Sequence, residues 1–222
     1  MKSFRSIDSA NEQMVARFLD DNFYIPPLFD KAIRVSDKQE QLKGKDVIVS
    51  SSQLGLHEVC IDEKDTAHYV NKNIPTFAFE LSFLLYDGTE VEGWLTDEAK
   101  ETEYYLLLWP FAKLVEPVSR PPEFKEITKL RYLLVKRSDV ISLLRDKGFD
   151  RAHLLQKARE MRSIVGGNDD NQRLKAIDKE QYGFYFMYTY FLKERPVNVV
   201  IPRQTLEGIA IASGYCEKKQ LL

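Results

Sequence analysis

Three apolar segments near the amino terminus are joined by short polar connections, which limits how they can pair. The segments are "KAIRV" at residues 31–35, "KDVIVSS" at residues 45–51 and "GLHEVCIDEK" at residues 55–64. Parallel strands need a crossover of about a dozen residues or more, whereas antiparallel strands can be joined by turns. The sequence therefore predicts an antiparallel three-stranded meander in this part of the chain.

Helices and further strands are predicted on both sides of the meander. Residues 8–24 carry apolar side chains at helical spacing and precede two prolines. A turn at Asp87 and Gly88 is expected to form a hairpin, and Pro110 is expected to stop a strand. The remaining predicted elements are strands at 75–86, 103–112, 130–137, 182–192 and 197–202 and helices at 138–149, 150–167 and 203–214. This order predicts an α/β fold with a mixed β-sheet flanked by helices.

The length of 222 residues fits one hydrophobic core. We expect a single α/β domain over residues 1–222, in which residues 1–114 form the core and residues 125–222 form a C-terminal extension packed on the same core. The chain has no apolar run long enough for a membrane span and no signal-peptide pattern at its start. The sequence therefore predicts a cytoplasmic protein without a membrane partner.

The charge of the chain is nearly balanced, with 32 basic and 34 acidic residues and a net charge of −2. Such a balance excludes attraction of nucleic acid by the molecule as a whole. Residues 125–175 nevertheless contain thirteen Lys or Arg against seven Asp or Glu. This segment either lies along a phosphate backbone or forms the solvent-facing side of helices, and the sequence leaves both interpretations open.

The end of the third segment carries the residues with the clearest chemical potential. Asp62 and Lys64 share one face of the strand, because side chains alternate between the two faces. Asp46 begins the preceding strand, and an early residue of one antiparallel strand lies near a late residue of its neighbour. Two carboxylates brought together repel each other unless a cation lies between them, and Mg²⁺ prefers such oxygen ligands. The alternative is an ordinary charged strand end in solvent.

An acid, a gap of fifteen residues and then acid-x-Lys on the next strand resembles the PD-(D/E)xK nuclease superfamily. The matching residues are Asp46 and the run Asp62-Glu63-Lys64. The resemblance implies a restriction-endonuclease-like core in residues 1–114, formed by a helix, a three-strand meander, a helix and a strand, with additional strands and helices in the C-terminal half. The second helix of this core would have to fit within residues 65–74. Lys45 stands where the proline of the motif would be.

The same resemblance implies a site and a reaction. It implies Mg²⁺ or Mn²⁺ bound by Asp46, Asp62 and the backbone carbonyl of Glu63, and hydrolysis of a phosphodiester, with DNA as the substrate, by metal-activated water. Lys64 would orient or help deprotonate the water, or offset charge on the phosphate. Many members of the superfamily also place a glutamate from the first helix at the metal, and Glu12 is the candidate for that position.

Several alternatives stay open at this point. Gln41 and Lys43 either contact phosphate or form a polar start to the second strand. The alternating aromatic residues between 182 and 191 either stack on bases or pack against helices. A rival to the nuclease is an inactive binding or assembly module that keeps the nuclease fold. Nicking of both strands of a duplex would favour a homodimer, for which the sequence supplies no interface.

Overall fold

The computed structural model describes residues 4–164, 182–190 and 192–219, and the chain forms two compact units. The first unit consists of Met1–Ile74, Thr102–Lys136 and Ala210–Leu222, and the second consists of Pro75–Glu101 and Arg137–Ile209. Each unit is therefore built from segments that are distant in sequence. Residues 115–123 connect β6 and β7, which are neighbouring strands of the first unit.

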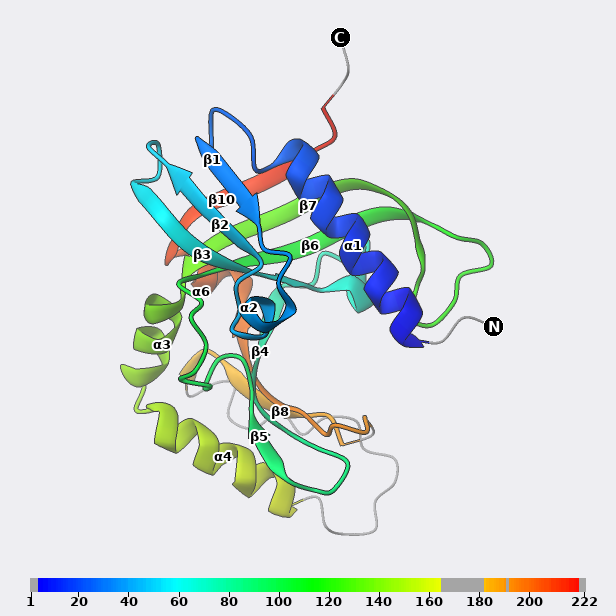
Figure 1. The fold of residues 1–222 in the computed structure, drawn as a ribbon. Helices are drawn as coiled ribbons and strands as arrows, with labels where there is room; N and C mark the ends of the chain where they lie inside the picture. Colours follow the sequence, from blue (N-terminus) through cyan, green and yellow to red (C-terminus); the bar gives the residue numbers. More distant parts are fainter. Residues whose placement is uncertain (1–3, 165–181, 191, 220–222) are drawn as a thin grey trace. The chain divides into compact units, whose positions relative to one another are not determined.

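The first unit contains a six-stranded mixed sheet, which bears out the predicted α/β class (Figure 1). Its strand order is β1-β2-β3-β6-β7-β10, and every neighbouring pair is antiparallel except β3 and β6, which are parallel. The predicted meander is confirmed as β1, β2 and β3. The elements are α1 (Phe4–Asn22), β1 (Lys31–Arg34), α2 (Lys38–Leu42), β2 (Val47–Ser51), β3 (Leu56–Asp65), η1 (Ala67–Tyr69), β6 (Tyr104–Leu114), β7 (Phe124–Lys136) and β10 (Ala210–Glu217).

The strand that joins the meander differs from the expected one. Residues 76–84 belong to the second unit, and β6 instead lies beside β3. Only the 3-10 helix η1 forms within residues 65–74, where the resemblance implied a helix. The chain leaves the first unit after residue 74 and returns at residue 102. The connection between the parallel strands β3 and β6 therefore includes residues 75–101 of the second unit.

Pro110 was expected to end a strand, but β6 continues through it to Leu114. The carbonyl oxygen of Pro110 accepts a hydrogen bond of 3.0 Å from the backbone N–H of Asn71. The nitrogen of a strand residue points to the same side as its carbonyl, and the ladder between β3 and β6 ends at Leu108. The missing N–H of Pro110 therefore removes no hydrogen bond between the strands. Proline is tolerated in a sheet at positions of this kind.

The closing helix expected over residues 203–214 is shorter than the sequence pattern indicated. It ends at Glu207 as α6, and residues 210–217 form β10 at the edge of the first sheet. Side chains of β10 alternate between exposed and partly buried, because the strand pairs with β7 over Lys129–Val135. Pairing with β7, which is a tertiary contact, decides the conformation of these residues over the helical pattern.

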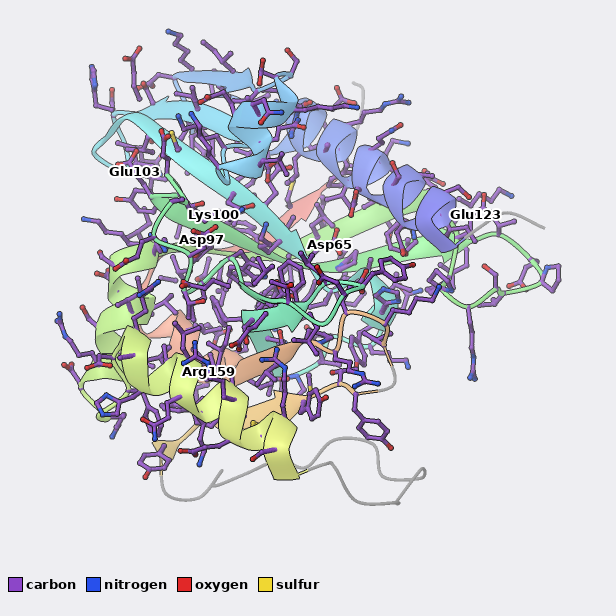
Figure 2. The ribbon with its side chains drawn as sticks, turned by 60° about the horizontal axis from the view of Figure 1, so that its bottom comes forward. Asp65, Asp97, Lys100, Glu103, Glu123 and Arg159 are labelled. Carbon is purple, nitrogen blue, oxygen red and sulfur yellow. The ribbon has the colours of Figure 1, made fainter. Side chains whose placement is uncertain are left out.

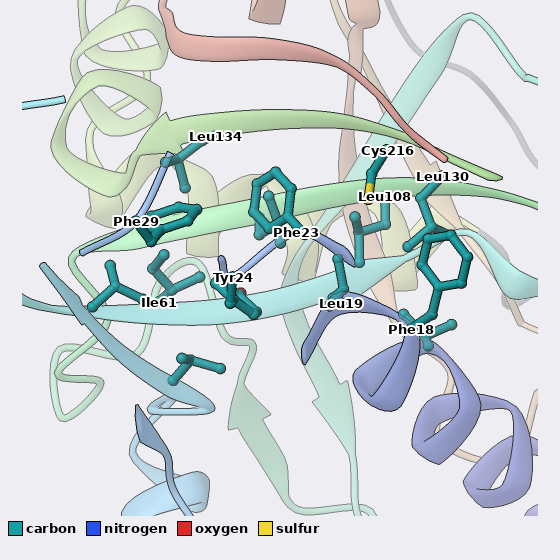
Figure 3. Packing of buried hydrophobic residues seen from close by; sticks show 14 of the residues in the cluster. Phe18, Leu19, Phe23, Tyr24, Phe29, Ile61, Leu108, Leu130, Leu134 and Cys216 are labelled. Carbon is teal, nitrogen blue, oxygen red and sulfur yellow. The ribbon is translucent and has the colours of Figure 1, made fainter. Parts of the chain in front are cut away.

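The core of the first unit lies between α1 and one face of the sheet (Figure 3). Leu19 and Phe23 of the α1 region meet Ile61, Leu108 and Leu134 from three adjacent strands, all of them buried. Complete burial of one such side chain contributes roughly 1.5 to 3 kcal/mol. Because these residues alternate along their strands, the intervening residues point to the opposite face of the sheet.

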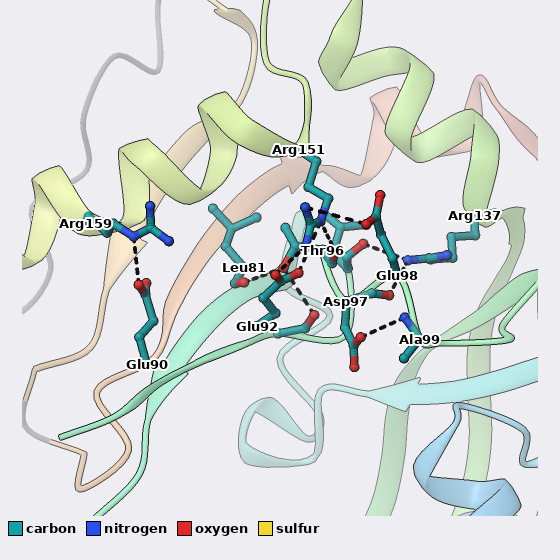
Figure 4. Close-up of polar contacts among 12 residues, drawn as sticks. Leu81, Glu90, Glu92, Thr96, Asp97, Glu98, Ala99, Arg137, Arg151 and Arg159 are labelled. Atoms are coloured by element: carbon teal, nitrogen blue, oxygen red, sulfur yellow. Dashed lines mark hydrogen bonds and ion pairs between the residues drawn. The ribbon is translucent and has the colours of Figure 1, made fainter. Parts of the chain in front are cut away.

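The second unit contains an antiparallel sheet of order β5-β4-β9-β8, and α4 contacts three of its strands. The predicted hairpin at Asp87 and Gly88 is confirmed as β4 and β5. Figure 4 shows Arg151 of α4 joined to Glu92 and Arg159 joined to Glu90. The elements are β4 (Thr76–Leu84), β5 (Glu90–Glu92), α3 (Arg137–Arg145), α4 (Arg151–Ile164), β8 (Tyr185–Tyr188), β9 (Val197–Pro202) and α6 (Arg203–Glu207).

The alternating aromatic residues of the second unit pack inward. Phe184, Phe186 and Tyr188 are buried, and Phe149 contacts the rings of Phe184 and Phe186 with centroid separations of 5.6 and 5.2 Å. These three residues therefore form core and are not a base-stacking surface. Phe191, which belongs to the same series, lies outside the described residues.

The longest helix in the described part of the chain, α1, has 19 residues. No helix among the described residues is both long and apolar enough to cross a membrane.

Candidate functional site

Asp46 and Asp62 lie opposite each other on neighbouring strands. Val47 pairs with Ile61 across β2 and β3, and the backbone N–H of Asp46 donates to the Ile61 carbonyl at 2.9 Å. The next pair outward is therefore Asp46 with Asp62, whose side chains share one face. Val47 and Ile61 face the core beneath α1, so the two aspartates point to the other face of the sheet. The expected meeting of the two acids thus follows from strand register.

Asp62 is held in an enclosed position beside a lysine. Its side chain is 3% exposed, and the ammonium of Lys64 donates a hydrogen bond to its Oδ1. The Lys64 side chain is 28% exposed, so the ammonium also reaches solvent. A buried carboxylate needs a partner of opposite charge, and Lys64 supplies it from two residues further along the same face.

Burial and the neighbouring charge of Asp62 raise the pKa of Asp46 to about 7, against the opposing influence of Lys64. The Oδ2 atom of Asp46 accepts a hydrogen bond of 2.8 Å from the backbone N–H of Glu63. The single lysine therefore does not offset both carboxylates. A divalent cation between them would favour the ionised form of each.

This electrostatic arrangement predicts that neutralising Asp46 stabilises the metal-free protein above neutral pH. The pKa of Asp46 is raised in the folded state, so its contribution to stability is lost as pH rises from about 4 through 7. Asp46→Asn keeps an acceptor for the Glu63 N–H and removes the charge. At about pH 8 we expect the variant to unfold at a higher urea concentration, with a free energy of unfolding up to about 4 kcal/mol above that of the wild type. At about pH 4 the two free energies should be closer.

The measurement is urea unfolding of both proteins in EDTA across that pH range. Asp21→Asn is the matched control, since Asp21 is exposed on α1 and carries the same charge. If the free energy of unfolding depends on pH equally in Asp46→Asn and wild-type protein, the pKa of Asp46 is not raised in the folded state.

The Glu63 carboxylate points away from the aspartate pair. It forms a two-pronged ion pair with Arg34, with both N–O distances at 3.0 Å. Arg34 also binds Asp20 and the Ala16 carbonyl of α1. Burial raises the pKa of Glu63, and the hydrogen bonds from Arg34 oppose this. Only the backbone of Glu63 lies beside the pair, which is the part of the residue that the resemblance implicated.

Glu12 approaches the end of β3 from α1. Its pKa is raised by burial and by the charges of Asp65 and Asp8, and it is lowered by Lys64. Figure 2 shows Asp65 at the end of β3. Within the described residues, the structure gives Glu12 no hydrogen bond or ion pair with Asp46 or Asp62. The structure therefore brings Glu12 near Lys64 and Asp65, and its role at a metal stays a prediction.

Gln41 and Lys43 take part in contacts within the protein. The side-chain amide of Gln41 donates to the Val35 carbonyl at 2.8 Å. Glu40 binds Lys43 and Lys45, each at 2.7 Å, and these two lysines hold the pKa of Glu40 at about 2. Contacts from Gln41 and Lys43 to a phosphate stay a prediction, because both side chains have structural partners in this arrangement.

Gly44 and Thr102 also shape the site, although neither residue was among the candidates expected from the sequence. Gly44 ends α2 with a φ of +80°, and its carbonyl accepts a hydrogen bond of 2.9 Å from Thr102 Oγ1. A Cβ on Gly44 would lie 2.1 Å from that oxygen and 3.3 Å from Asp62 Oδ2. The absence of a side chain at residue 44 therefore lets Thr102 and Asp62 pack against the backbone before Asp46.

Gly44→Ala is expected to lower the free energy of unfolding by about 2 to 4 kcal/mol, from left-handed strain and the clash with Thr102. Gly55→Ala is the control, because Gly55 has a φ of +65° and its Cβ would meet nothing within 4 Å. The control should lose only about 1 kcal/mol. Urea unfolding measures both changes, and Thr102→Ala in the Gly44→Ala background should recover part of the loss. Equal losses at both glycines would rule out the proposed contact.

The chemistry available to this site is that of two carboxylates and one ammonium. Within the described ranges, no group of three or more His, Cys, Asp or Glu side chains is arranged to hold a metal ion. Mg²⁺ commonly binds one or two carboxylates and retains several waters, so a pair such as Asp46 and Asp62 meets its needs. The donor set fits a hard divalent cation and lacks the sulfur or imidazole ligands of a zinc site.

No protein-family model, curated protein or solved structure matches this chain.

Proposed function

We propose that this protein is a divalent-metal-dependent nuclease whose centre is Asp46, Asp62 and Lys64. The observation that carries the proposal is the position of two acids opposite each other on β2 and β3, with a lysine in contact with the second acid. Charges at an ordinary strand end would be solvated, whereas the Asp62 side chain is buried. A buried carboxylate pair with only one ammonium is costly without a cation, which is typical of functional sites.

The order of elements in the first unit supports the PD-(D/E)xK resemblance. Helix α1 precedes the meander of β1, β2 and β3, and the short helix η1 follows it before β6 lies parallel to β3. Three features depart from the pattern that the resemblance implies. Lys45 replaces the proline, η1 has only three residues, and residues 75–101 separate η1 from β6.

Asp46 and Asp62 would hold the metal ion, and the Glu63 carbonyl would be a third oxygen ligand. Bound Mg²⁺ or Mn²⁺ would supply activation of a water and stabilisation of charge on the phosphoryl group. Lys64, beside Asp62, would donate to a phosphate oxygen and offset the charge that develops there. In the hydrolysis, the water oxygen bonds to phosphorus, the bond to the leaving sugar oxygen breaks, and a proton from the water ends on that oxygen.

DNA is the proposed substrate because of the family resemblance. The site itself offers ligands for a metal and a phosphodiester, which DNA and RNA share.

The test is incubation of the purified protein with plasmid, single-stranded DNA and single-stranded RNA in Mg²⁺, Mn²⁺ or EDTA. We expect cleavage of DNA in either metal and none in EDTA. Metal binding without cleavage of any substrate would contradict the nuclease and favour the inactive binding module. Preferential cleavage of RNA would keep the reaction and change the substrate.

A further inference from the structure

The face of the first sheet that carries Asp62 and Lys64 also carries a cluster of aromatic and basic side chains. We call Phe111, Lys129, Arg131 and Tyr215 the aromatic-basic patch. Phe111 pairs with Lys129 across β6 and β7, and Arg131 pairs with Tyr215 across β7 and β10. The residues between them, such as Leu130 and Cys216, belong to the core under α1. The patch therefore lies on the face opposite α1.

Cations in this patch lie over aromatic rings. The Lys129 ammonium is 4.9 Å from the centroid of the Phe111 ring and 5.0 Å from that of Tyr215. The Arg131 guanidinium lies 5.5 Å from the centroid of Tyr215. Contacts of this kind hold the cations in place, and Arg131 also donates a hydrogen bond of 3.4 Å to the Tyr215 hydroxyl.

Lys129 makes no ion pair with a carboxylate among the residues that the structure describes. Neighbouring Lys113 and Lys218 differ, because both bind Glu126 at 2.7 and 3.1 Å. Tyr215 is 49% exposed, although it is a large aromatic residue. An exposed ring beside a cation without a carboxylate offers a surface for a base and a charge for a phosphate.

Strand register gives the separation between this patch and the aspartate pair. Lys64 is aligned with Leu107, and Leu107 is aligned with Leu133. Arg131 lies two residues beyond Leu133 on β7. With strands about 4.8 Å apart and a rise of about 3.3 Å per residue, the backbones at Lys64 and Arg131 are about 12 Å apart. Leu107 and Leu133, which lie between them on this face, are buried, so the patch is a surface separate from the aspartate pair.

We propose that the aromatic-basic patch binds a single strand of nucleic acid, through stacking on Tyr215 and a phosphate contact to Lys129. Proteins that bind single strands without sequence preference combine these two features. The inference rests on the proposed function for the class of ligand, because a nuclease needs a surface that holds the strand it cuts. Binding at the patch itself requires no cleavage, so it can be tested separately.

The experiment measures fluorescence anisotropy of a labelled oligothymidylate with the full-length protein in EDTA, across about 50 to 200 mM salt. We expect Lys129→Met to weaken binding about three- to tenfold and to reduce the slope of log affinity against log salt by about 0.7. Tyr215→Leu should weaken binding about five- to tenfold at each salt concentration with little change of slope. Tyr215→Phe keeps the ring and should bind as the wild type does.

Lys31→Met is the matched control, because Lys31 lies on β1 at the opposite edge of the same sheet. It should leave both affinity and salt slope unchanged. Urea unfolding of each variant identifies any loss of fold. If Tyr215→Leu and Tyr215→Phe are equally stable but only Tyr215→Phe binds as the wild type does, the loss of binding comes from loss of the ring. No binding by the wild type, or equal losses in Lys31→Met and Lys129→Met, would overturn the proposal.

Cleavage assays separate this inference from the nuclease proposal. Weakened binding in the patch variants, with no cleavage by the wild type or any variant, would support binding at the patch and contradict the proposed nuclease activity. Metal-dependent cleavage with an unchanged KM and unchanged binding in the patch variants would support the nuclease and contradict the patch.

Discussion

Asp62→Asn protein is expected to cleave DNA on the order of 10³-fold more slowly than the wild type in saturating Mg²⁺. The substitution removes one of the two proposed carboxylate ligands and leaves the ammonium of Lys64 beside a neutral amide. Loss of a metal-stabilised transition state costs several kcal/mol, and each 1.4 kcal/mol corresponds to about tenfold in rate. The measurement is the initial rate of plasmid nicking by wild-type and variant proteins purified in parallel.

Asp21→Asn provides the matched control for this loss. It makes the same chemical change on the exposed surface of α1 in the same unit. The control should cleave at the wild-type rate. If Asp62→Asn and Asp21→Asn proteins retain equal activity, the cleavage comes from another site or from a contaminating nuclease.

Arg34→Met is expected to lower the free energy of unfolding by about 3 kcal/mol near pH 8. The Glu63 side chain is 11% exposed and loses both hydrogen bonds from Arg34. Burial already raises the pKa of Glu63, and removing Arg34 raises it further. Protonated Glu63 needs no cationic partner, so the destabilisation should shrink as pH falls toward about 5.

Urea unfolding at both pH values measures this effect. Lys31→Met is the control, since it breaks the ion pair with Glu58, whose side chains are 58% and 60% exposed. An exposed pair of this kind contributes at most about 1 kcal/mol. Arg34→Met combined with Glu63→Leu should recover much of the stability. An Arg34→Met variant as stable as the wild type at pH 8 would show that the contacts of Arg34 with Glu63 and α1 do not stabilise the fold.

Local pattern predicted the meander and the first helix because both depend on neighbouring residues. Short connections force antiparallel pairing of β1, β2 and β3, and the apolar spacing of α1 repeats every three or four residues. The partner of β3 could not be found in this way. The chain makes β6 that partner only after residues 75–101 enter the second unit, and no local feature of the 76–84 strand indicates which sheet it joins.

The same distinction applies to the candidate site. Asp46 and Asp62 were brought together by alternation and antiparallel register, which the sequence carries. The bond between Gly44 and Thr102 joins residues 58 positions apart, and the Arg34–Glu63 pair joins residues 29 apart. Such contacts depend on tertiary packing. In the sequence, Gly44 is one glycine in a polar connection before a strand, and nothing local links it to Thr102.

Calorimetric titration of Mn²⁺ into wild-type, Asp46→Asn and Asp62→Asn proteins measures whether the two aspartates bind a divalent metal. The titration is done at about pH 8, because metal affinity rises when carboxylates are ionised. We predict saturable binding to the wild type and its loss in both variants, with unfolding transitions that show each variant to be folded. Binding that persists in both variants, or no binding by the folded wild type, would contradict a metal site at Asp46 and Asp62.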